Sequence, residues 1–139
     1  MLRILALLFA FALPAAAQPA ITGEDLAEIR AVIHRQIEAL RRDDAQEAFK
    51  LVSPAVQETF GTPERFLDVV RASYGAMVRP TSVVFLGLTV MGEEAVQRVK
   101  LTDRGGAVWL AYYAMQRQKD GSWRTNGCHL VQPSKSIST

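Results

Sequence analysis

Apolar and polar positions follow two different rhythms along this chain, and the change comes at Pro80. Before it, hydrophobic residues such as Ile29, Ile33 and Ile37 recur every three or four positions, the spacing that places them on one face of an α-helix. After it, β-branched and aromatic residues gather in runs that turn signals separate, as in antiparallel strands. The pattern therefore predicts an α+β fold, with helices first and a sheet after them.

Local signals predict where three helices begin and end. Thr22 and Asp25 form a variant of the capping box, in which a hydroxyl and a carboxylate bind backbone N–H groups of the first turn. Thr62 and Pro63 make the N-cap-then-proline start of the last helix, and Pro80 lies beyond its end. The predicted helices span about residues 22–41, 45–52 and 62–77, with one further helical turn that ends at Gly61.

The predicted strands span about residues 81–91, 95–103, 107–118 and 123–132. Between the last two, Asp120 and Gly121 suit a two-residue type I′ turn, because both central positions of that turn need a positive φ. Such a turn pairs Tyr113 with Cys128 across the hairpin. It also puts Trp123 on the opposite face of the sheet from these two residues.

Both faces of the last two predicted strands are largely apolar. One face carries Trp109, Tyr113 and Met115, and the other carries Leu110 and Tyr112. An antiparallel sheet with one face in water shows polar alternation, so we expect both faces to be covered. We expect the helices on one face and a second copy of the chain on the other, in a homodimer formed through the sheet. The pattern does not decide which face meets the helices.

Residues 1–17 differ in composition from the rest of the chain. Arg3 precedes the apolar run 4–13, and the small residues Ala15–Ala17 follow, as in a cleaved signal peptide. The run is shorter than the about 20 residues that a bilayer span needs, and no cysteine follows it to carry a lipid anchor. We expect a periplasmic or secreted protein without membrane attachment, and one domain at 18–139 whose core covers about 22–132.

Composition and charge narrow the class of function. Sixteen Lys and Arg residues against fourteen Asp and Glu residues give a net charge of +2, so no basic footprint for nucleic acid is expected. The single cysteine, Cys128, cannot close a disulfide within the chain, and we expect it to be a buried apolar residue. His34 and His129 lack ligating neighbours at metal-site spacing, and no glycine-rich phosphate loop is present. We therefore predict no metal and no cofactor.

Several short motifs carry a resemblance to a known family. They are the helix end Arg42–Ala45, the pairs Ala48–Phe49, Ser53–Pro54, Phe60–Gly61 and Arg79–Pro80, Tyr74, the run Gly121–Trp123, and Gly127–Cys128. Over residues 26–132 they resemble the bacterial exported family known as domain of unknown function 4864. Helices followed by a long antiparallel meander also resemble the cystatin-like cone of nuclear transport factor two, SnoaL and ketosteroid isomerase.

The resemblance implies a fold and a surface but no reaction. It implies N-terminal helices packed on a curved, four-stranded antiparallel sheet, and proteins of this kind frequently form dimers through the sheet. The family has no assigned activity, so no catalytic residue is transferred.

A cone fold leaves a pocket between its helices and the concave side of its sheet. The residues that we expect to line it are Phe66, Tyr74, Trp109, Tyr113, Met115 and Cys128. The same side chains also fit a plain hydrophobic core. The acids Asp43, Asp44 and Asp103 fit helix caps and a turn better than catalysis, so no catalytic residue is assigned.

Three functions stay open at this point. By fold analogy, we expect a domain that binds a small apolar molecule or a protein partner rather than an enzyme. The first alternative is a cofactor-free isomerase, lyase or hydratase that uses a carboxylate and a tyrosine inside the cone. The second is a structural or assembly subunit whose cone is filled. A carboxylate of raised pKa in the pocket favours the enzyme, and a cone without a cavity favours the structural subunit.

Overall fold

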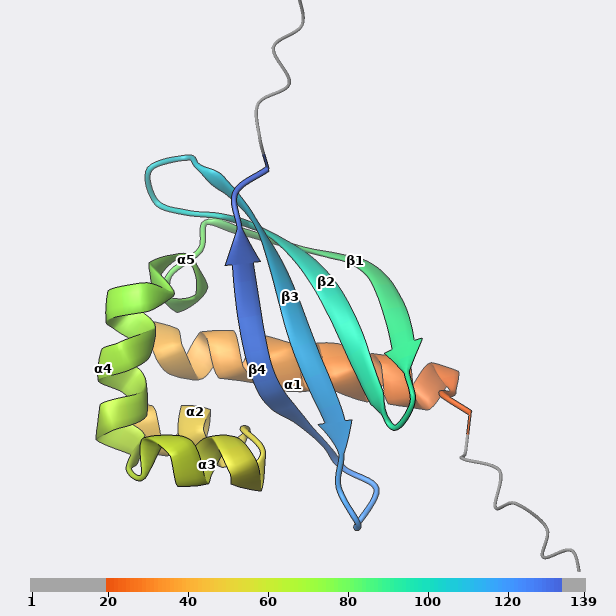
Figure 1. Cartoon of the computed structure of the whole chain (residues 1–139). Helices are drawn as coiled ribbons and strands as arrows, with labels where there is room; N and C mark the ends of the chain where they lie inside the picture. The colour runs from red at the N-terminus through yellow and green to blue at the C-terminus, as the bar shows by residue number, and fades with distance from the viewer. Residues whose placement is uncertain (1–19, 134–139) are drawn as a thin grey trace, which may run out of the picture.

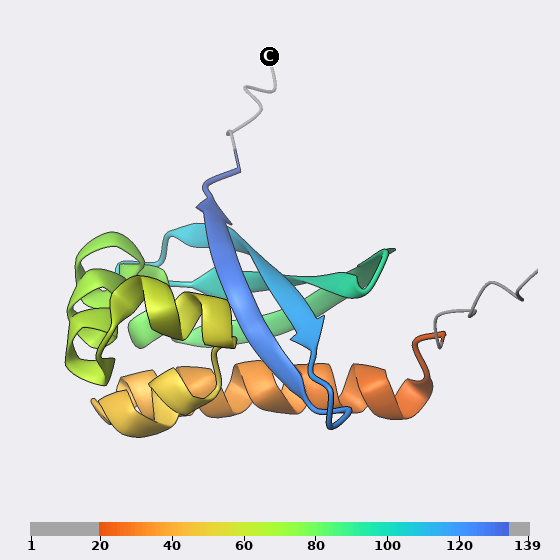
Figure 2. The same ribbon diagram turned by 60° about the horizontal axis from the view of Figure 1, so that its bottom comes forward.

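The computed structural model describes residues 20–133, and the predicted signal peptide lies outside this part. Helices precede a four-stranded antiparallel sheet of order β1-β2-β3-β4, which confirms the predicted α+β fold. The elements are α1 (Gly23–Arg41), α2 (Ala45–Lys50), α3 (Pro54–Phe60), α4 (Pro63–Ser73), α5 (Gly75–Val78), β1 (Ser82–Met91), β2 (Glu94–Thr102), β3 (Val108–Arg117) and β4 (Trp123–Val131). Helix α1 runs along the concave side of the curved sheet, while α2 to α5 gather at one end (Figures 1 and 2).

The helix ends follow the capping signals, with one difference. Thr22 Oγ1 accepts the N–H of Asp25 at 3.1 Å and the Asp25 carboxylate accepts the N–H of Thr22 at 2.9 Å, so the predicted capping box is present. The helix predicted over 62–77 is two helices, because Tyr74 has the non-helical angles φ −132° and ψ 43°. This break turns α5 away from α4 and closes the end of the cone (Figure 1).

The turn between β3 and β4 is not the predicted one. Gln118 and Ser122 close a three-residue loop, in which the N–H of Gly121 donates to Gln118 O at 2.9 Å. Gly121 has φ 87°, whereas Asp120 does not have a positive φ. A type I turn followed by a left-handed glycine has this geometry, and it is the commonest form of three-residue hairpin loop. The prediction of a two-residue type I′ turn was therefore wrong.

A β-bulge compensates for the extra loop residue. The loop shifts the pairing of β3 and β4 by one position, and Asn126 and Gly127 opposite Ala114 shift it back. Tyr113 consequently pairs with Cys128 as predicted. Trp123 lies before the bulge and is buried against α1, on the face opposite to the predicted one.

The core lies between α1 and the concave face of the sheet. The apolar stripe of α1, which includes the fully buried Ile29 and Ile33, packs there. Val99 and Leu101 of β2 and Ala111 of β3 are fully buried in the same cluster. The concave face is thus the one that carries Tyr113 and Met115, a point that the sequence pattern left open.

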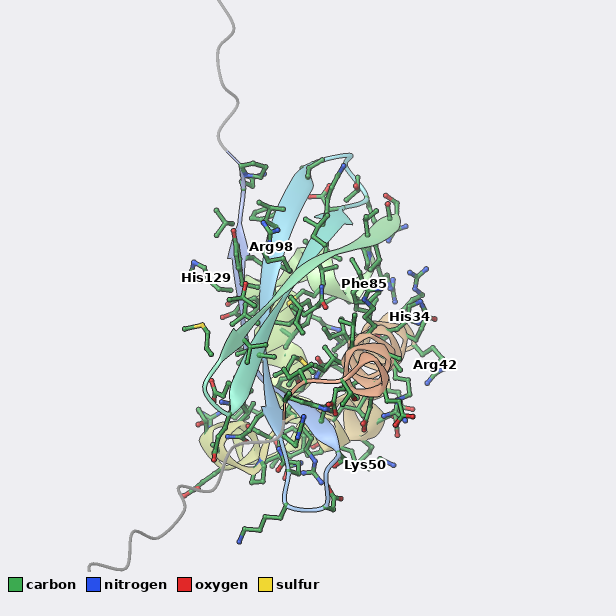
Figure 3. The ribbon with its side chains drawn as sticks, turned by 90° about the vertical axis from the view of Figure 1, so that its right-hand side faces the viewer. His34, Arg42, Lys50, Phe85, Arg98 and His129 are labelled. Atoms are coloured by element: carbon green, nitrogen blue, oxygen red, sulfur yellow. The ribbon has the colours of Figure 1, made fainter. Side chains whose placement is uncertain are left out.

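The outer face of the sheet is not covered by the described part of the chain. Val84, Val108 and Val131 are exposed there, and Leu110 and Tyr112 are half-buried between them. Figure 3 shows Arg98 and His129 on this same side, pointing away from α1, while His34 and Arg42 lie on the outward side of α1. The outer face therefore combines apolar side chains with an arginine and a histidine.

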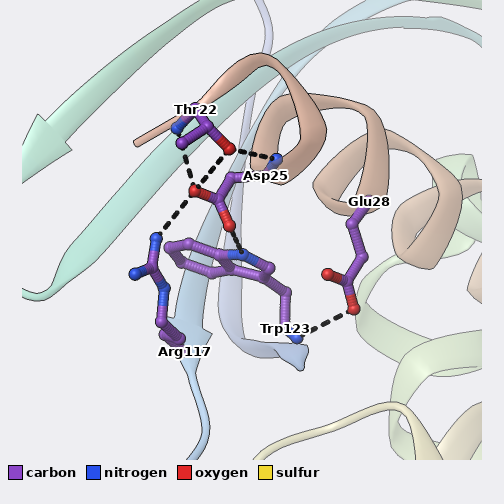
Figure 4. Close-up of polar contacts among 5 residues, drawn as sticks. All are labelled: Thr22, Asp25, Glu28, Arg117 and Trp123. Atoms are coloured by element: carbon purple, nitrogen blue, oxygen red, sulfur yellow. Dashed lines mark hydrogen bonds and ion pairs between the residues drawn. The ribbon is translucent and has the colours of Figure 1, made fainter. Parts of the chain in front are cut away.

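One polar cluster joins the start of α1 to the β3–β4 hairpin (Figure 4). The Asp25 carboxylate accepts the Trp123 indole N–H at 3.0 Å and pairs with the Arg117 guanidinium at 2.9 Å. The guanidinium also lies 4.9 Å from the centre of the Trp123 ring. The backbone N–H of Thr22 and the Trp123 indole hold the pKa of Asp25 below its usual value. These hydrogen bonds and the Asp25–Arg117 ion pair thus hold the start of α1 against the β3–β4 hairpin.

Candidate functional site

A cavity of about 220 Å³ lies between the short helices and the last two strands. Its wall consists of Gln36, Val52, Val56, Phe60, Phe66, Val70, Tyr74, Met77, Tyr113, Thr125, Gly127 and Cys128. Most of these side chains are aliphatic or aromatic, and none is an Asp, Glu, Lys, Arg or His. A pocket of this kind, apolar with a few polar groups, is typical of small-molecule sites.

Helix α3 is held over the cavity by its first residues. Ser53, the N-cap of α3, is fully buried and its hydroxyl donates to Asn126 Oδ1 at 2.6 Å. The N–H of Ser53 donates to Thr125 O at 2.8 Å, and the N–H of Thr125 donates to Leu51 O at 3.0 Å. These bonds add a short parallel segment to the edge of β4 and put Val56 and Phe60 of α3 in the cavity wall.

Aromatic packing forms the far side of the cavity. The ring of Phe66 on α4 lies edge-on to Phe60, with 5.3 Å between the ring centres, and 5.8 Å from Phe49. Such tilted and edge-to-face pairs are favourable ring arrangements. They keep α3 and α4 together around the hollow rather than filling it.

Four of the six predicted pocket residues line the cavity, namely Phe66, Tyr74, Tyr113 and Cys128. Trp109 and Met115 lie outside its wall. The indole of Trp109, near the start of β3, donates to Asp103 Oδ2 at 3.0 Å. Met115 is fully buried in the core.

Tyr113 is the unusual member of the cavity wall. Its side chain is fully buried, and its hydroxyl has no hydrogen-bond partner among the described residues. Burial, with a smaller effect of Cys128 beside it, raises the pKa of the Tyr113 phenol well above its ordinary value. Burial likewise raises the pKa of the Cys128 thiol to about 12, so both groups keep their protons at neutral pH.

Two further polar side chains of the wall, Gln36 and Thr125, were not predicted. The Gln36 amide nitrogen donates to Ala48 O at 3.3 Å and to Thr125 Oγ1 at 3.1 Å. Thr125 Oγ1 in turn lies 3.4 Å from Leu51 O. Gln36 falls on the apolar stripe of α1, and a polar residue in such a stripe is the signal that could have identified it.

The acidic residues considered in the sequence lie away from the cavity. Asp43 has a left-handed φ of 58° after α1 and pairs with Arg71 and Arg79. Asp44 caps α2 by accepting the N–H of Glu47 at 3.1 Å. Asp103 accepts the N–H groups of its own turn, at Gly105 and Ala107. The carboxylates of Asp44 and Asp103 therefore serve a helix end and a turn, as expected, whereas the Asp43 carboxylate forms ion pairs instead of the expected cap.

The described residues contain neither a metal-binding cluster nor a helix that could span a membrane. Between residues 20 and 133, no cluster of three or more His, Cys, Asp or Glu side chains could hold a metal ion. Over the same range, no helix has the length and apolar character to cross a membrane.

A second hollow, of about 440 Å³, lies at the end of the sheet where the two hairpin turns meet the start of α1. Its wall consists of Ala20, Ile21, Val90, Gly92, Glu93, Arg117, Gln118, Lys119 and Trp123. This hollow differs from the cone cavity because charged side chains belong to its wall.

The fold is similar to that of several solved structures. An NTF-2 like protein of unknown function from Silicibacter pomeroyi DSS-3 matches with a TM-score of 0.57 and 18% identity, over 82% of this chain and 100% of that chain. A protein of unknown function with a cystatin-like fold from Nostoc punctiforme matches with a TM-score of 0.56 and 14% identity, over 85% and 98%. A ketosteroid isomerase-like protein from Erwinia carotovora atroseptica matches with a TM-score of 0.55 and 16% identity, over 81% and 99%.

These likenesses confirm the predicted NTF2-like cone and, at such low identities, concern the fold alone. The comparison with curated proteins gave no match. Residues 22–137 match the family described as a domain of unknown function, DUF4864, which is the family that the sequence motifs resembled. The chain belongs to the DUF4864 family.

Proposed function

We propose that this domain binds a small apolar molecule in the cavity between its helices and its sheet. The observation that carries the proposal is the hollow of about 220 Å³ with an uncharged, largely hydrocarbon wall. An engineered apolar cavity of about 150 Å³ stays dry and binds benzene, so by scaling this one suits a ligand of about eight to ten non-hydrogen atoms. A structural subunit would not need such a space.

Binding fits this wall better than acid–base catalysis does. A general acid or base works best with a pKa near the working pH. In the cavity wall, Tyr113 and Cys128 are the titratable groups with shifted pKa values, and both are shifted upward, away from neutrality. The wall contains no carboxylate to act with them. The observations thus favour a carrier or sensor of a small molecule.

Titration with cumene (isopropylbenzene), followed by NMR of the methyl groups in the cavity wall, tests the proposal. Val56→Trp fills the cavity from the half-buried face of α3, and Ala55→Trp puts the same indole on the exposed face of that helix. We expect saturable binding to the wild type and to A55W, and none to V56W. Equal binding to V56W and A55W, or none to the wild type, contradicts the proposal.

We further propose that the domain acts in the periplasm or outside the cell. The support is the signal-peptide pattern of residues 1–17 in the sequence. Mass spectrometry of the chain expressed in a bacterial host should find an N-terminus at Gln18, in the exported fraction. A full-length chain retained in the cytoplasm contradicts this.

We also propose that the outer face of the sheet binds a second copy of the chain. The exposed valines supply apolar area, and β2 carries Glu94 at one end of this face and Lys100 at the other. A two-fold axis between them brings each carboxylate near the partner's ammonium group, so the face is complementary to itself. Light scattering should give a dimer for the wild type and for Val90→Asp, which lies off this face, and a monomer for Leu110→Asp. A monomeric wild type contradicts the proposal.

A further inference from the structure

We infer that the ligand of the cone cavity is an uncharged molecule with one hydrogen-bond acceptor, such as a ketone or ester oxygen. This oxygen accepts a hydrogen bond from the Tyr113 hydroxyl. The inference rests on the proposed function and specifies its ligand. It makes Tyr113 the residue that selects the ligand, while the apolar wall provides most of the contact area.

The first step concerns the unpaired hydroxyl. Nearly all buried polar side-chain atoms in folded proteins have a partner, because an unpaired one has lost its hydrogen bonds to water and gained none. Tyr113 is fully buried, and its hydroxyl has no partner within the described range 20–133. A phenylalanine would fill nearly the same space without this penalty. Since Tyr113 lines the cavity, a ligand there is the group that can accept a hydrogen bond from its hydroxyl.

The second step concerns the other donors of the wall. Both partners of the Gln36 amide nitrogen are protein oxygens, Ala48 O and Thr125 Oγ1. The Thr125 hydroxyl lies within reach of Leu51 O and can donate its proton there. The Cys128 thiol is only a weak donor. The remaining hydroxyl of the wall, that of Tyr74, belongs to a half-buried side chain. The fully buried strong donor that the wall leaves for a ligand is therefore the Tyr113 hydroxyl, which calls for an acceptor.

The third step concerns charge. Moving an ionised group from water into an apolar site is costly unless an opposite charge pairs with it. The cavity wall carries no charged side chain, and Tyr113 and Cys128 both stay protonated at neutral pH. A carboxylate or ammonium ligand would find no counter-ion there. The ligand is therefore neutral.

The position of Tyr113 sets the orientation. It lies on β3 at the sheet side of the cavity, whereas Phe60 and Phe66 come from the helices on the other side. The acceptor atom of the ligand therefore points to the sheet, and its hydrocarbon part lies against the two aromatic rings. A single ring with a short carbonyl substituent satisfies the size and the polarity together.

Three probes of similar size test the inference. Acetophenone carries the carbonyl, α-methylstyrene replaces that oxygen with a methylene group, and benzoate replaces the ketone with a charge. Their affinities are measured by NMR titration for the wild type, Tyr113→Phe and Tyr112→Phe. Tyr112 is the matched control because it lies on the same strand but on the outer face. Comparing affinity ratios between variants removes the difference in hydrophobicity between the probes.

We expect the affinity ratio of acetophenone to α-methylstyrene to fall at least about fivefold in Y113F, the effect of one neutral hydrogen bond. The ratio stays unchanged in Y112F, and benzoate binds the wild type at least about tenfold more weakly than acetophenone. A ratio unchanged in Y113F, or benzoate bound as tightly as acetophenone, overturns the ligand class while the binding function stands. Absence of binding by all three probes overturns the binding function itself. Thermal melts of both variants confirm that they are folded.

Discussion

Replacing Tyr113 with phenylalanine should make the unliganded domain more stable. The substitution keeps the ring in the core and removes an oxygen that is buried without a partner. An unpaired buried polar group costs about 1–3 kcal/mol. The small void left by the oxygen costs about 0.3 kcal/mol, at the usual cost per unit of cavity volume. The expected net gain is about 1–2 kcal/mol, or roughly 4 °C in melting temperature per kcal/mol for a domain of this size.

Urea unfolding at 25 °C, followed by tryptophan fluorescence, measures this effect. Tyr112→Phe is the control, because Tyr112 is half-buried on the outer face and its loss should change the free energy of unfolding by less than about 0.5 kcal/mol. If Y113F is instead less stable than the wild type by about 1 kcal/mol or more, the hydroxyl has a partner in solution, such as an internal water. In that case the reasoning from the unpaired hydroxyl is refuted.

Three other residues give direct predictions. Hydrogen bonds from the Thr22 N–H and the Trp123 indole lower the pKa of Asp25 in the folded state, so its carboxylate stabilises the protein above pH 3.8, and this stabilisation is lost as the pH falls through the folded value. Asp25→Asn should therefore reduce the free energy of unfolding in urea at pH 7, and much less at pH 2. Cys128, with a pKa of about 12, should react with Ellman's reagent at pH 8 far more slowly in the folded chain than in guanidinium, and equal rates contradict this. Gly127 has φ 120°, so Gly127→Ala should lower the free energy of unfolding by about 1–3 kcal/mol, measured by thermal unfolding. Gly75→Ala should change the free energy of unfolding little, because Gly75 does not have a positive φ.

The β3–β4 hairpin shows how far local sequence decides structure. Asp120 and Gly121 suit a two-residue turn and a three-residue turn alike, since both accept a glycine in the left-handed region. The choice depends on the bulge at Asn126–Gly127, and Asn126 is bound by Ser53 from a distant part of the chain. A contact of this range has no signature in the hairpin's own residues. The position of Trp123 was mispredicted for the same reason.

The cavity could be predicted in part. Strand alternation correctly placed Tyr113 and Cys128 together on the concave face, and helical spacing added Phe66. Alternation also predicted Trp109 and Met115 as pocket residues, and they do not line the cavity. Alternation identifies every residue on one face of the sheet, but it does not show which part of that face the helices leave uncovered. Helix α1 runs along the concave face (Figure 2), and the hollow remains between the short helices and the last two strands. How much of the concave face the helices cover depends on how they pack together, which the spacing of residues within one strand or helix does not reveal.

A crystal structure of the domain with acetophenone tests the central claim most directly. The ligand should lie in the cavity beside Phe66, with its carbonyl oxygen about 2.5–3.0 Å from the Tyr113 hydroxyl. An empty cavity with the ligand in the second hollow, beside Arg117 and Lys119, would contradict the account, as would a carbonyl oxygen turned away from Tyr113.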